Sequence, residues 1–180
     1  MKYVCLDFPR DVHSKIWNHL LPGKQYNEEA AFGFVRAVTN HDGIPTFRLV
    51  DSYLIGCDGF EYQSSFHLEL ADKERARVIK RAHDLDASIV EFHSHLSKEE
   101  PSFSASDIYG FEETVPHFIW RLKGKPYFAI VVSRAGFDGL AWIESADRPV
   151  QLKSLRVEGQ TYQATCKTLK YYDTTRTRSM

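Results

Sequence analysis

Residues 87–107 read Ala87-Ser-Ile-Val-Glu-Phe-His-Ser-His-Leu-Ser-Lys-Glu-Glu-Pro-Ser-Phe-Ser-Ala-Ser-Asp107. The apolar run over residues 87–92 predicts a β-strand that ends in two histidines, His93 and His95. Side chains at i and i+2 of a strand point to the same face, and their α-carbons lie about 6.5 Å apart. The two imidazoles can therefore bind the same metal ion.

A short loop over residues 96–103 follows the strand, and Ser104 then has the sequence position of a helix N-cap with Asp107 at N3. This turn brings the carboxylate of Asp107 back toward the end of the strand. A hydrolytic zinc site has three nitrogen or oxygen ligands at about 2.0–2.2 Å and leaves a fourth position for water. His93, His95 and Asp107 meet that requirement, so we expect one Zn2+ per chain.

Each half of this pattern also has an ordinary structural explanation. A chain with 8 histidines in 180 residues readily contains a His-x-His pair by chance, and a serine followed three residues later by an acid is a common helix-capping signal. A His-x-His pair followed, after a short loop, by a Ser-x-x-Asp is much rarer by chance than either signal alone. Their combination favours a metal site.

The composition indicates one globular domain. The chain has 180 residues, of which 43% are hydrophobic, and its formal net charge is -1, so nothing in the overall charge calls for nucleic acid or a membrane surface as a partner. Cys5, Cys57 and Cys166 are far apart and form no C-x-x-C, which fits a reducing compartment. We find no signal peptide or membrane span and expect a cytoplasmic protein.

Periodicity predicts an α/β fold built from a single mixed, largely antiparallel sheet flanked by helices. The expected helices cover residues 11–21, 71–85 and 104–114. Pro116 should interrupt the last of these, and residues 117–122 are either a second helical piece or the start of the next loop. The expected strands cover residues 3–8, 28–38, 46–55, 66–70, 87–95, 127–132, 139–144, 150–157 and 161–169. Turns are expected at residues 40–43 and 158–159. We expect one domain over residues 1–172 and a polar tail over residues 173–180.

A zinc-bound water also needs a base that does not itself bind the metal. Glu28 and Glu29 are the candidates, because they open an otherwise apolar strand where burying a carboxylate is costly without a partner. A catalytic pocket would supply that partner. Glu91 should face the same side of its strand as the histidines. It is either a second partner that orients a ligand ring or an acid at the edge of the core.

Glu28, His93-Ser-His95 and Ser104-Ala-Ser-Asp107 together resemble the JAMM motif of the JAB/MPN metalloprotease family, and the resemblance covers residues 1–170. It implies the JAB/MPN, cytidine-deaminase-like architecture, with His93, His95 and Asp107 as zinc ligands. Glu28 would be the general acid/base and Ser104 a donor to the oxyanion of the tetrahedral intermediate. Glu28 matches the family better than Glu29, because small and apolar residues follow in Glu28-Glu-Ala-Ala-Phe32. The chain departs from the family pattern at Leu96, where proline is usual, and in having eight rather than seven residues before Ser104.

The resemblance implies a zinc isopeptidase or peptidase that cleaves after the C-terminal glycine of a ubiquitin-like protein. The compact prokaryotic proteins that the chain resembles occur beside ubiquitin-activating-like and ubiquitin-conjugating-like enzymes, which are therefore expected partners along with the ubiquitin-like protein or its conjugate. An alternative is a processing peptidase for a sulfur-carrier or another diglycine-ended protein. A non-catalytic MPN-like scaffold is a further alternative, although scaffolds of that class typically lack the metal ligands.

Overall fold

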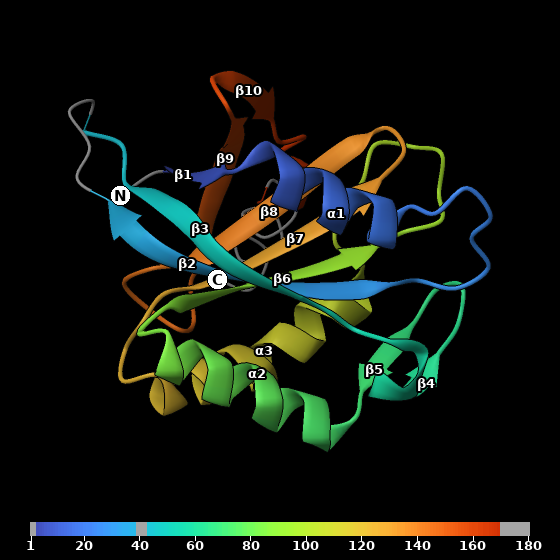
Figure 1. Ribbon diagram of the computed structural model, residues 1–180, viewed down its shortest axis with the longest axis horizontal. Helices are drawn as coiled ribbons and strands as arrows, with labels where there is room; N and C mark the ends of the chain where they lie inside the picture. The colour runs from blue at the N-terminus through green and yellow to red at the C-terminus, as the bar shows by residue number, and fades with distance from the viewer. Residues whose placement is uncertain (1–2, 39–42, 170–180) are drawn as a thin grey trace, which may run out of the picture.

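The computed structural model describes residues 3–38 and 43–169 (Figure 1). Its strands are β1 (Tyr3–Phe8), β2 (Ala30–Val38), β3 (Thr46–Leu54), β4 (Phe60–Gln63), β5 (Leu68–Leu70), β6 (Ser88–Ser94), β7 (Tyr127–Ser133), β8 (Gly136–Trp142), β9 (Val150–Val157) and β10 (Gln160–Gln163). Its helices are α1 (Arg10–Leu20), the short 3-10 helix η1 (Cys57–Gly59), α2 (Asp72–Asp84) and α3 (Ala105–Arg121). In the described part of the chain, no helix combines the length and apolar character that crossing a membrane requires.

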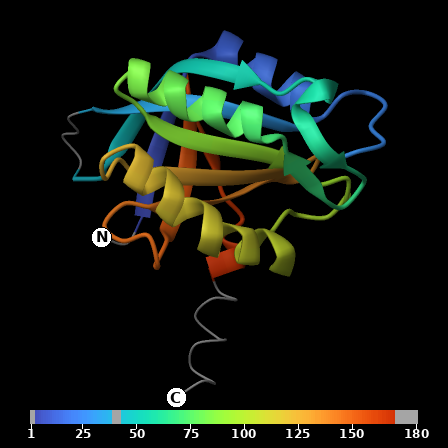
Figure 2. The same cartoon turned by 90° about the horizontal axis from the view of Figure 1, so that it is seen from below.

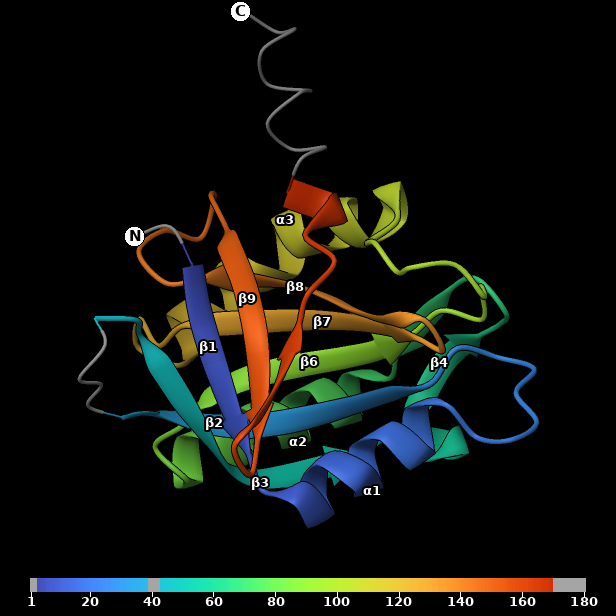
Figure 3. The same ribbon diagram turned by 90° about the horizontal axis from the view of Figure 1, so that it is seen from above.

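The main sheet closes on itself. Its strands follow the order β1-β3-β2-β6-β7-β8-β9, and β1 also pairs in parallel with β9, which completes a ring of seven strands. At this junction Leu6 lies opposite Leu155. β10 pairs with β9 outside the ring, and β4 and β5 form a separate two-stranded sheet. Figure 3 shows β1 and β9 side by side, crossing over β6 and β7.

The expected architecture, a single sheet flanked by helices, is therefore wrong, although the chain is a mixed α/β protein. The sheet is a closed barrel, and α2 and α3 lie together on one side of it (Figure 2). The closing pair joins β1 at the start of the chain to β9 near its end. A pairing between such distant segments has no turn signal in the sequence, because turn chemistry marks only neighbouring strands.

The barrel interior is a single apolar cluster to which each of the seven strands contributes. Alternate residues of each strand point inward, as the period of two requires. The inward residues on the strands are Val4, Leu6, Phe8, Ala31, Val35, Phe47, Leu49, Val90, Phe92, Phe128, Ile130, Val132, Phe137, Ala141, Leu152, Leu155 and Val157. Ile16 and Leu20 of α1 join the same cluster. Helix α1 therefore packs onto the interior core, on the side away from α2 and α3 (Figure 1).

A second apolar cluster lies on the outer face of β2, β6, β7 and β8, under α2 and α3. Helix α2 contributes Val78 and Ala82, and the strands contribute residues such as Phe32, Ile89 and Val131. The inward side chains of α3 are Phe111, Val115, Phe118 and Leu122. β6 thus has apolar neighbours on both faces, which explains its near-continuous hydrophobic sequence.

The sequence predicted that Pro116 interrupts the helix after Ser104, but α3 continues past this residue. It runs from Ala105 to Arg121 with the proline inside it. Proline removes one backbone hydrogen bond and costs about 3 kcal/mol in a helix interior. Val115 and Phe118, on either side of the proline, are 0% and 2% exposed, and burial of this apolar face offsets that cost.

The terminal hairpin forms at the predicted turn but is shorter than expected. Glu158 and Gly159 have φ angles of 46° and 85°, the positive values that a two-residue type I′ turn requires. The predicted strand over residues 161–169 is wrong beyond Gln163, where β10 ends. The turn expected at residues 40–43 falls largely on residues 39–42, outside the described residues, as does the tail over residues 173–180.

Candidate metal centre

Two histidines lie at the end of β6, between β2 and β7. His93 is opposite Ala30 of β2 and Val131 of β7, and the backbone nitrogen of His95 donates to the carbonyl of Val132 at 2.8 Å. Both flanking strands therefore hold the backbone of the pair. The i, i+2 spacing points both imidazoles to the outer face, where α3 begins.

Asp107 is held in place by the start of α3. Ser104 is the N-cap, its Oγ accepts from the backbone nitrogen of Asp107 at 3.2 Å, and its own backbone nitrogen donates to Asp107 Oδ2 at 2.7 Å. These two bonds form a capping box, so the predicted cap is confirmed. The reciprocal bonds fix the side-chain rotamer that directs Asp107 toward the histidines.

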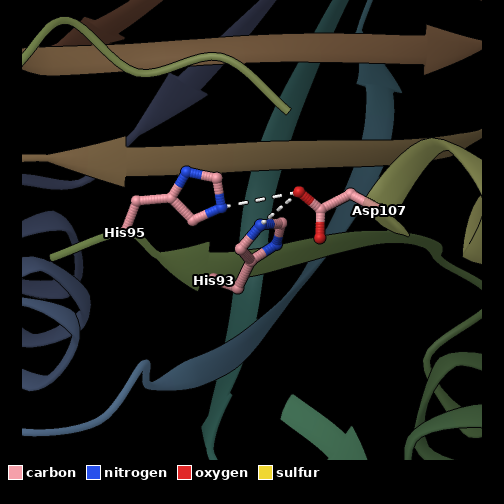
Figure 4. A group of neighbouring side chains, drawn as sticks. All are labelled: His93, His95 and Asp107. Carbon is pink, nitrogen blue, oxygen red and sulfur yellow. Dashed lines mark ion pairs between the residues drawn. The ribbon is translucent and has the colours of Figure 1, made fainter. Parts of the chain in front are cut away.

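The three predicted ligands lie together (Figure 4). Asp107 Oδ2 is 3.4 Å from His95 Nε2 and 3.6 Å from His93 Nε2, and one potential ligand atom from each residue lies within 4.8 Å of the others. Tetrahedral coordination at the usual zinc bond lengths separates two ligand atoms by about 3.3 Å. The group can therefore hold a metal ion.

His93 gives the clearest sign that this group fits a metal. The residue is 4% exposed, and its Nε2 is buried without a hydrogen-bond partner. At 3.6 Å, the carboxylate of Asp107 is too far away for a hydrogen bond. An unpartnered polar atom is costly in the interior, and coordination of a cation would remove that cost.

The charges in this group strongly perturb one another. Burial opposes ionisation of Asp107, but the adjacent His93 and His95 and the hydroxyl of Ser104 outweigh it and hold the pKa of that carboxyl well below its usual range. Burial alone would lower the pKa of His93. The carboxylates of Asp107, Glu91 and Glu28 outweigh burial and raise that pKa above its ordinary value. The site is thus an acidic environment that favours a cation between its side chains.

Glu28 lies next to the imidazoles, just before β2. Its Oε1 is 3.8 Å from His95 Nε2, and the residue is 5% exposed. Its backbone nitrogen donates to the Ser64 carbonyl at 2.7 Å, and its carbonyl accepts from Gln63 Nε2 at 2.8 Å. Burial raises the pKa of Glu28 above its ordinary value. A proton acceptor with a raised pKa is better matched to proton transfer near neutral pH.

Glu29 makes a different set of contacts. Its carboxylate accepts from Gln63 Nε2 at 3.3 Å, and its backbone nitrogen donates to Ser94 Oγ at 2.9 Å. Neighbouring residues of an extended chain point to opposite sides. Of the two glutamates left open by the sequence, Glu28 is the one beside the histidines.

Ser104 and Glu91 are tied to other side chains. The Ser104 hydroxyl lies 2.7 Å from Asp107 Oδ2 and 2.8 Å from the hydroxyl of Ser106, so in this structure it acts as a cap. Glu91 accepts a hydrogen bond from the hydroxyl of Tyr127 rather than from an imidazole. Glu91 also lines a cavity beside the metal ligands.

The residues that anchor the loop before α3 could not be predicted from the sequence. The ring of Phe103 lies 5.5 Å from that of His93, and its backbone nitrogen donates to Thr168 Oγ1 at 2.9 Å. The hydroxyl of Thr168 in turn donates to Asp138 Oδ2 at 2.7 Å. Asp138 and Thr168 belong to no motif, and only the fold brings them to this loop.

The chain was compared with models of known protein families and with curated protein sequences, and neither comparison found a match. The support for a metal ion at this position therefore comes from geometry: two imidazoles and one carboxylate converge at the junction of β6 and α3, with a buried glutamate beside them.

Proposed function

We propose that this protein is a zinc-dependent hydrolase of amide bonds. The observation that carries the proposal is the position of Glu28 Oε1, 3.8 Å from His95 Nε2, beside three residues that can hold one metal ion. Three protein ligands of nitrogen and oxygen are the usual set of a catalytic zinc, since a fourth position stays free for water. Zinc is the metal that this ligand set and its JAMM-like spacing favour.

Zinc bound to His93, His95 and Asp107 would supply a Lewis acid and lower the pKa of a bound water toward about 7. Glu28 Oε1 would accept a proton from the attacking water and later pass it to the nitrogen of the leaving amine. The raised pKa of Glu28 suits both proton transfers, because it reduces the difference between the pKa of the carboxyl group and the pKa of the bound water.

Ser104 would contribute in a second way if its hydroxyl turned from Asp107 toward the substrate. A hydroxyl that donates to the developing oxyanion is worth about 3–4 kcal/mol of transition-state stabilisation. Ser104 is an exposed residue at the N-terminus of α3, where its Oγ is bonded to Asp107 Oδ2.

The proposed substrate is the C-terminal tail of a ubiquitin-like protein, cleaved after its last glycine. This part of the proposal comes from the resemblance of Glu28, His93-Ser-His95 and Ser104-Ala-Ser-Asp107 to the JAMM motif. Processing of a sulfur-carrier or another diglycine-ended protein would use the same chemistry. Comparing a linear C-terminal fusion with a lysine-linked conjugate as substrates would distinguish the two activities.

The test combines metal content with cleavage. We expect about one zinc per chain after metal-replete purification, cleavage of a diglycine-ended ubiquitin-like fusion, and loss of cleavage when a chelator removes the metal. Glu28→Ala should abolish cleavage while zinc remains bound at one equivalent. Normal turnover by that variant would remove Glu28 from the mechanism, and less than about 0.2 zinc per chain would favour a non-catalytic scaffold.

A further inference from the structure

A cavity of about 440 Å³ opens beside the metal ligands. Its wall includes His93 and Asp107, so the space is continuous with the metal centre. β5 and the start of α2 contribute to its wall, and so does α3 from Ser106 to Phe118. A group bound to the metal centre would therefore have direct access to this space.

The walls of the cavity are mostly apolar. Phe32, Phe111 and Phe118 supply aromatic surface, and Leu68 and Leu70 of β5 face them. A space of this volume is far larger than a glycine residue needs, and it can admit a long side chain with an aliphatic stem.

Carboxylates dominate the charges around the cavity. Glu69, Glu91 and Glu113 line it in addition to the candidate ligand Asp107, and the basic residues of the lining are Arg75, His67 and His93. Arg75 is already paired, with Asp72 at 2.9 Å and with Glu69 at 3.9 Å. Glu91 accepts one hydrogen bond from the Tyr127 hydroxyl. A carboxylate has two oxygens, so Glu91 can accept a hydrogen bond from a second donor as well. Glu91 and Glu113 are thus the acceptors that the lining offers to a cationic group.

We propose that this cavity binds the side chain of the residue on the amine side of the scissile amide, and that it selects a lysine or an arginine there. The placement depends on the proposed function, because a diglycine on the acyl side has no side chain to fill the space. The stem would lie against Phe32 and Phe111, and the cationic end would pair with Glu91 and Glu113. A like-charged glutamate would be rejected by the same carboxylates.

Binding can be measured without any cleavage. Isothermal titration calorimetry on the full chain carrying Glu28→Ala, with zinc and without it, would compare three N-acetylated amides: Gly-Gly-Arg, Gly-Gly-norleucine and Gly-Gly-Glu. We expect the arginine peptide to bind about tenfold more tightly than the norleucine peptide, with or without zinc, and the glutamate peptide to bind most weakly. Equal affinities for the three peptides would overturn the proposal.

Substitutions then test which carboxylates cause the preference for the arginine peptide. Glu91→Gln and Glu113→Gln should each remove most of the arginine preference and leave norleucine binding unchanged. Glu112→Gln is the matched control, since this exposed neighbour of Glu113 is not among the residues that line the cavity. A preference that survives both cavity substitutions, or falls equally with Glu112→Gln, would contradict the assignment. Thermal melting of each variant would verify that it is folded.

Filling the cavity provides an independent test. Gly110 of α3 lines the space, and a Cβ built there has no heavy atom within 4 Å. Gly110→Leu should therefore fold normally and weaken the arginine and norleucine peptides, but not N-acetyl-Gly-Gly-Gly-amide. Unchanged affinity for all three would contradict the proposal.

The two proposals can fail separately. An arginine preference in binding, with no cleavage of any fusion by the zinc-loaded wild-type chain, would leave the cavity assignment standing and reject the hydrolase. Cleavage at one rate for fusions with arginine, norleucine or glutamate after the diglycine would retain the hydrolase and reject the cavity's role.

Discussion

Asp138 and Thr168 are joined by two hydrogen bonds: the backbone nitrogen of Thr168 lies 2.8 Å, and its hydroxyl 2.7 Å, from Asp138 Oδ2. Asp138 is 0% exposed on β8, and Thr168 is 2% exposed near the end of the described chain. Thr168 Oγ1 also accepts from the backbone nitrogen of Phe103, whose ring lies beside His93. The pair thus connects the C-terminal segment to the loop that carries the chain from His95 to Asp107.

Removing the Asp138 carboxylate should destabilise the protein strongly. Asp138 also accepts from the backbone nitrogens of Gly139 and Cys166, so Asp138→Ala would leave several buried donors unsatisfied and lower the free energy of unfolding by about 3–5 kcal/mol. Thr168→Val should cost less, about 1–2 kcal/mol, because only its hydroxyl is lost. Urea denaturation would measure both, with the exposed Asp147→Ala as a control expected to change stability by less than about 0.5 kcal/mol.

Zinc should stabilise the fold through its ligands. At a free concentration about 1,000 times its dissociation constant, a ligand that binds only the folded chain adds about 4 kcal/mol, which corresponds to a rise in melting temperature of roughly 10 °C for a domain of this size. Calorimetry should show this rise for the wild type and its reversal by a chelator. His95→Ala should remove most of it, and His117→Ala, which alters an exposed histidine of α3, should retain it. An equal rise in both variants would rule out His95 as a ligand.

The two roles of Ser104 can be separated. Ser104→Ala removes the N-cap of α3 and should lower stability by about 1 kcal/mol, and it should also lower kcat by about 10²–10³ if the hydroxyl donates to the oxyanion. Ser104→Thr keeps a capping hydroxyl and should retain both stability and turnover. A loss of stability in Ser104→Ala without a fall in kcat would restrict Ser104 to capping.

Closure of the barrel should be visible in amide hydrogen exchange. β1 pairs with β3 on one side and β9 on the other, so its amides should be protected about as strongly as those of β6. β10 pairs only with β9 among the described residues, and its side chains are exposed, so its amides provide the fast-exchanging comparison. Exchange of Val4 and Leu6 at the rate of β10 would indicate an open sheet with β1 as a free edge.

The three candidate metal ligands could be predicted from the sequence because their geometry is local. His93 and His95 share a face through the two-residue period of a strand, and the capping pattern places Asp107 in the first turn of the following helix. Glu28 and Glu29 could not be separated with the same certainty. The choice depends on how the segment before β2 lies against the β4–β5 hairpin, where the backbone of Glu28 bonds to Gln63 and Ser64.

The sequence by itself determined most of the helices and strands, the capping box and the three candidate metal ligands, since each depends on residues only a few positions apart. The tertiary structure alone decided that the sheet closes, that Glu28 rather than Glu29 lies beside the imidazoles, that Asp138 and Thr168 hold the loop before α3, and that a cavity borders the metal centre. These features arise from contacts between segments distant in sequence, such as β1 with β9. Their pairing is selected by packing of the whole core, and no short run of residues encodes it.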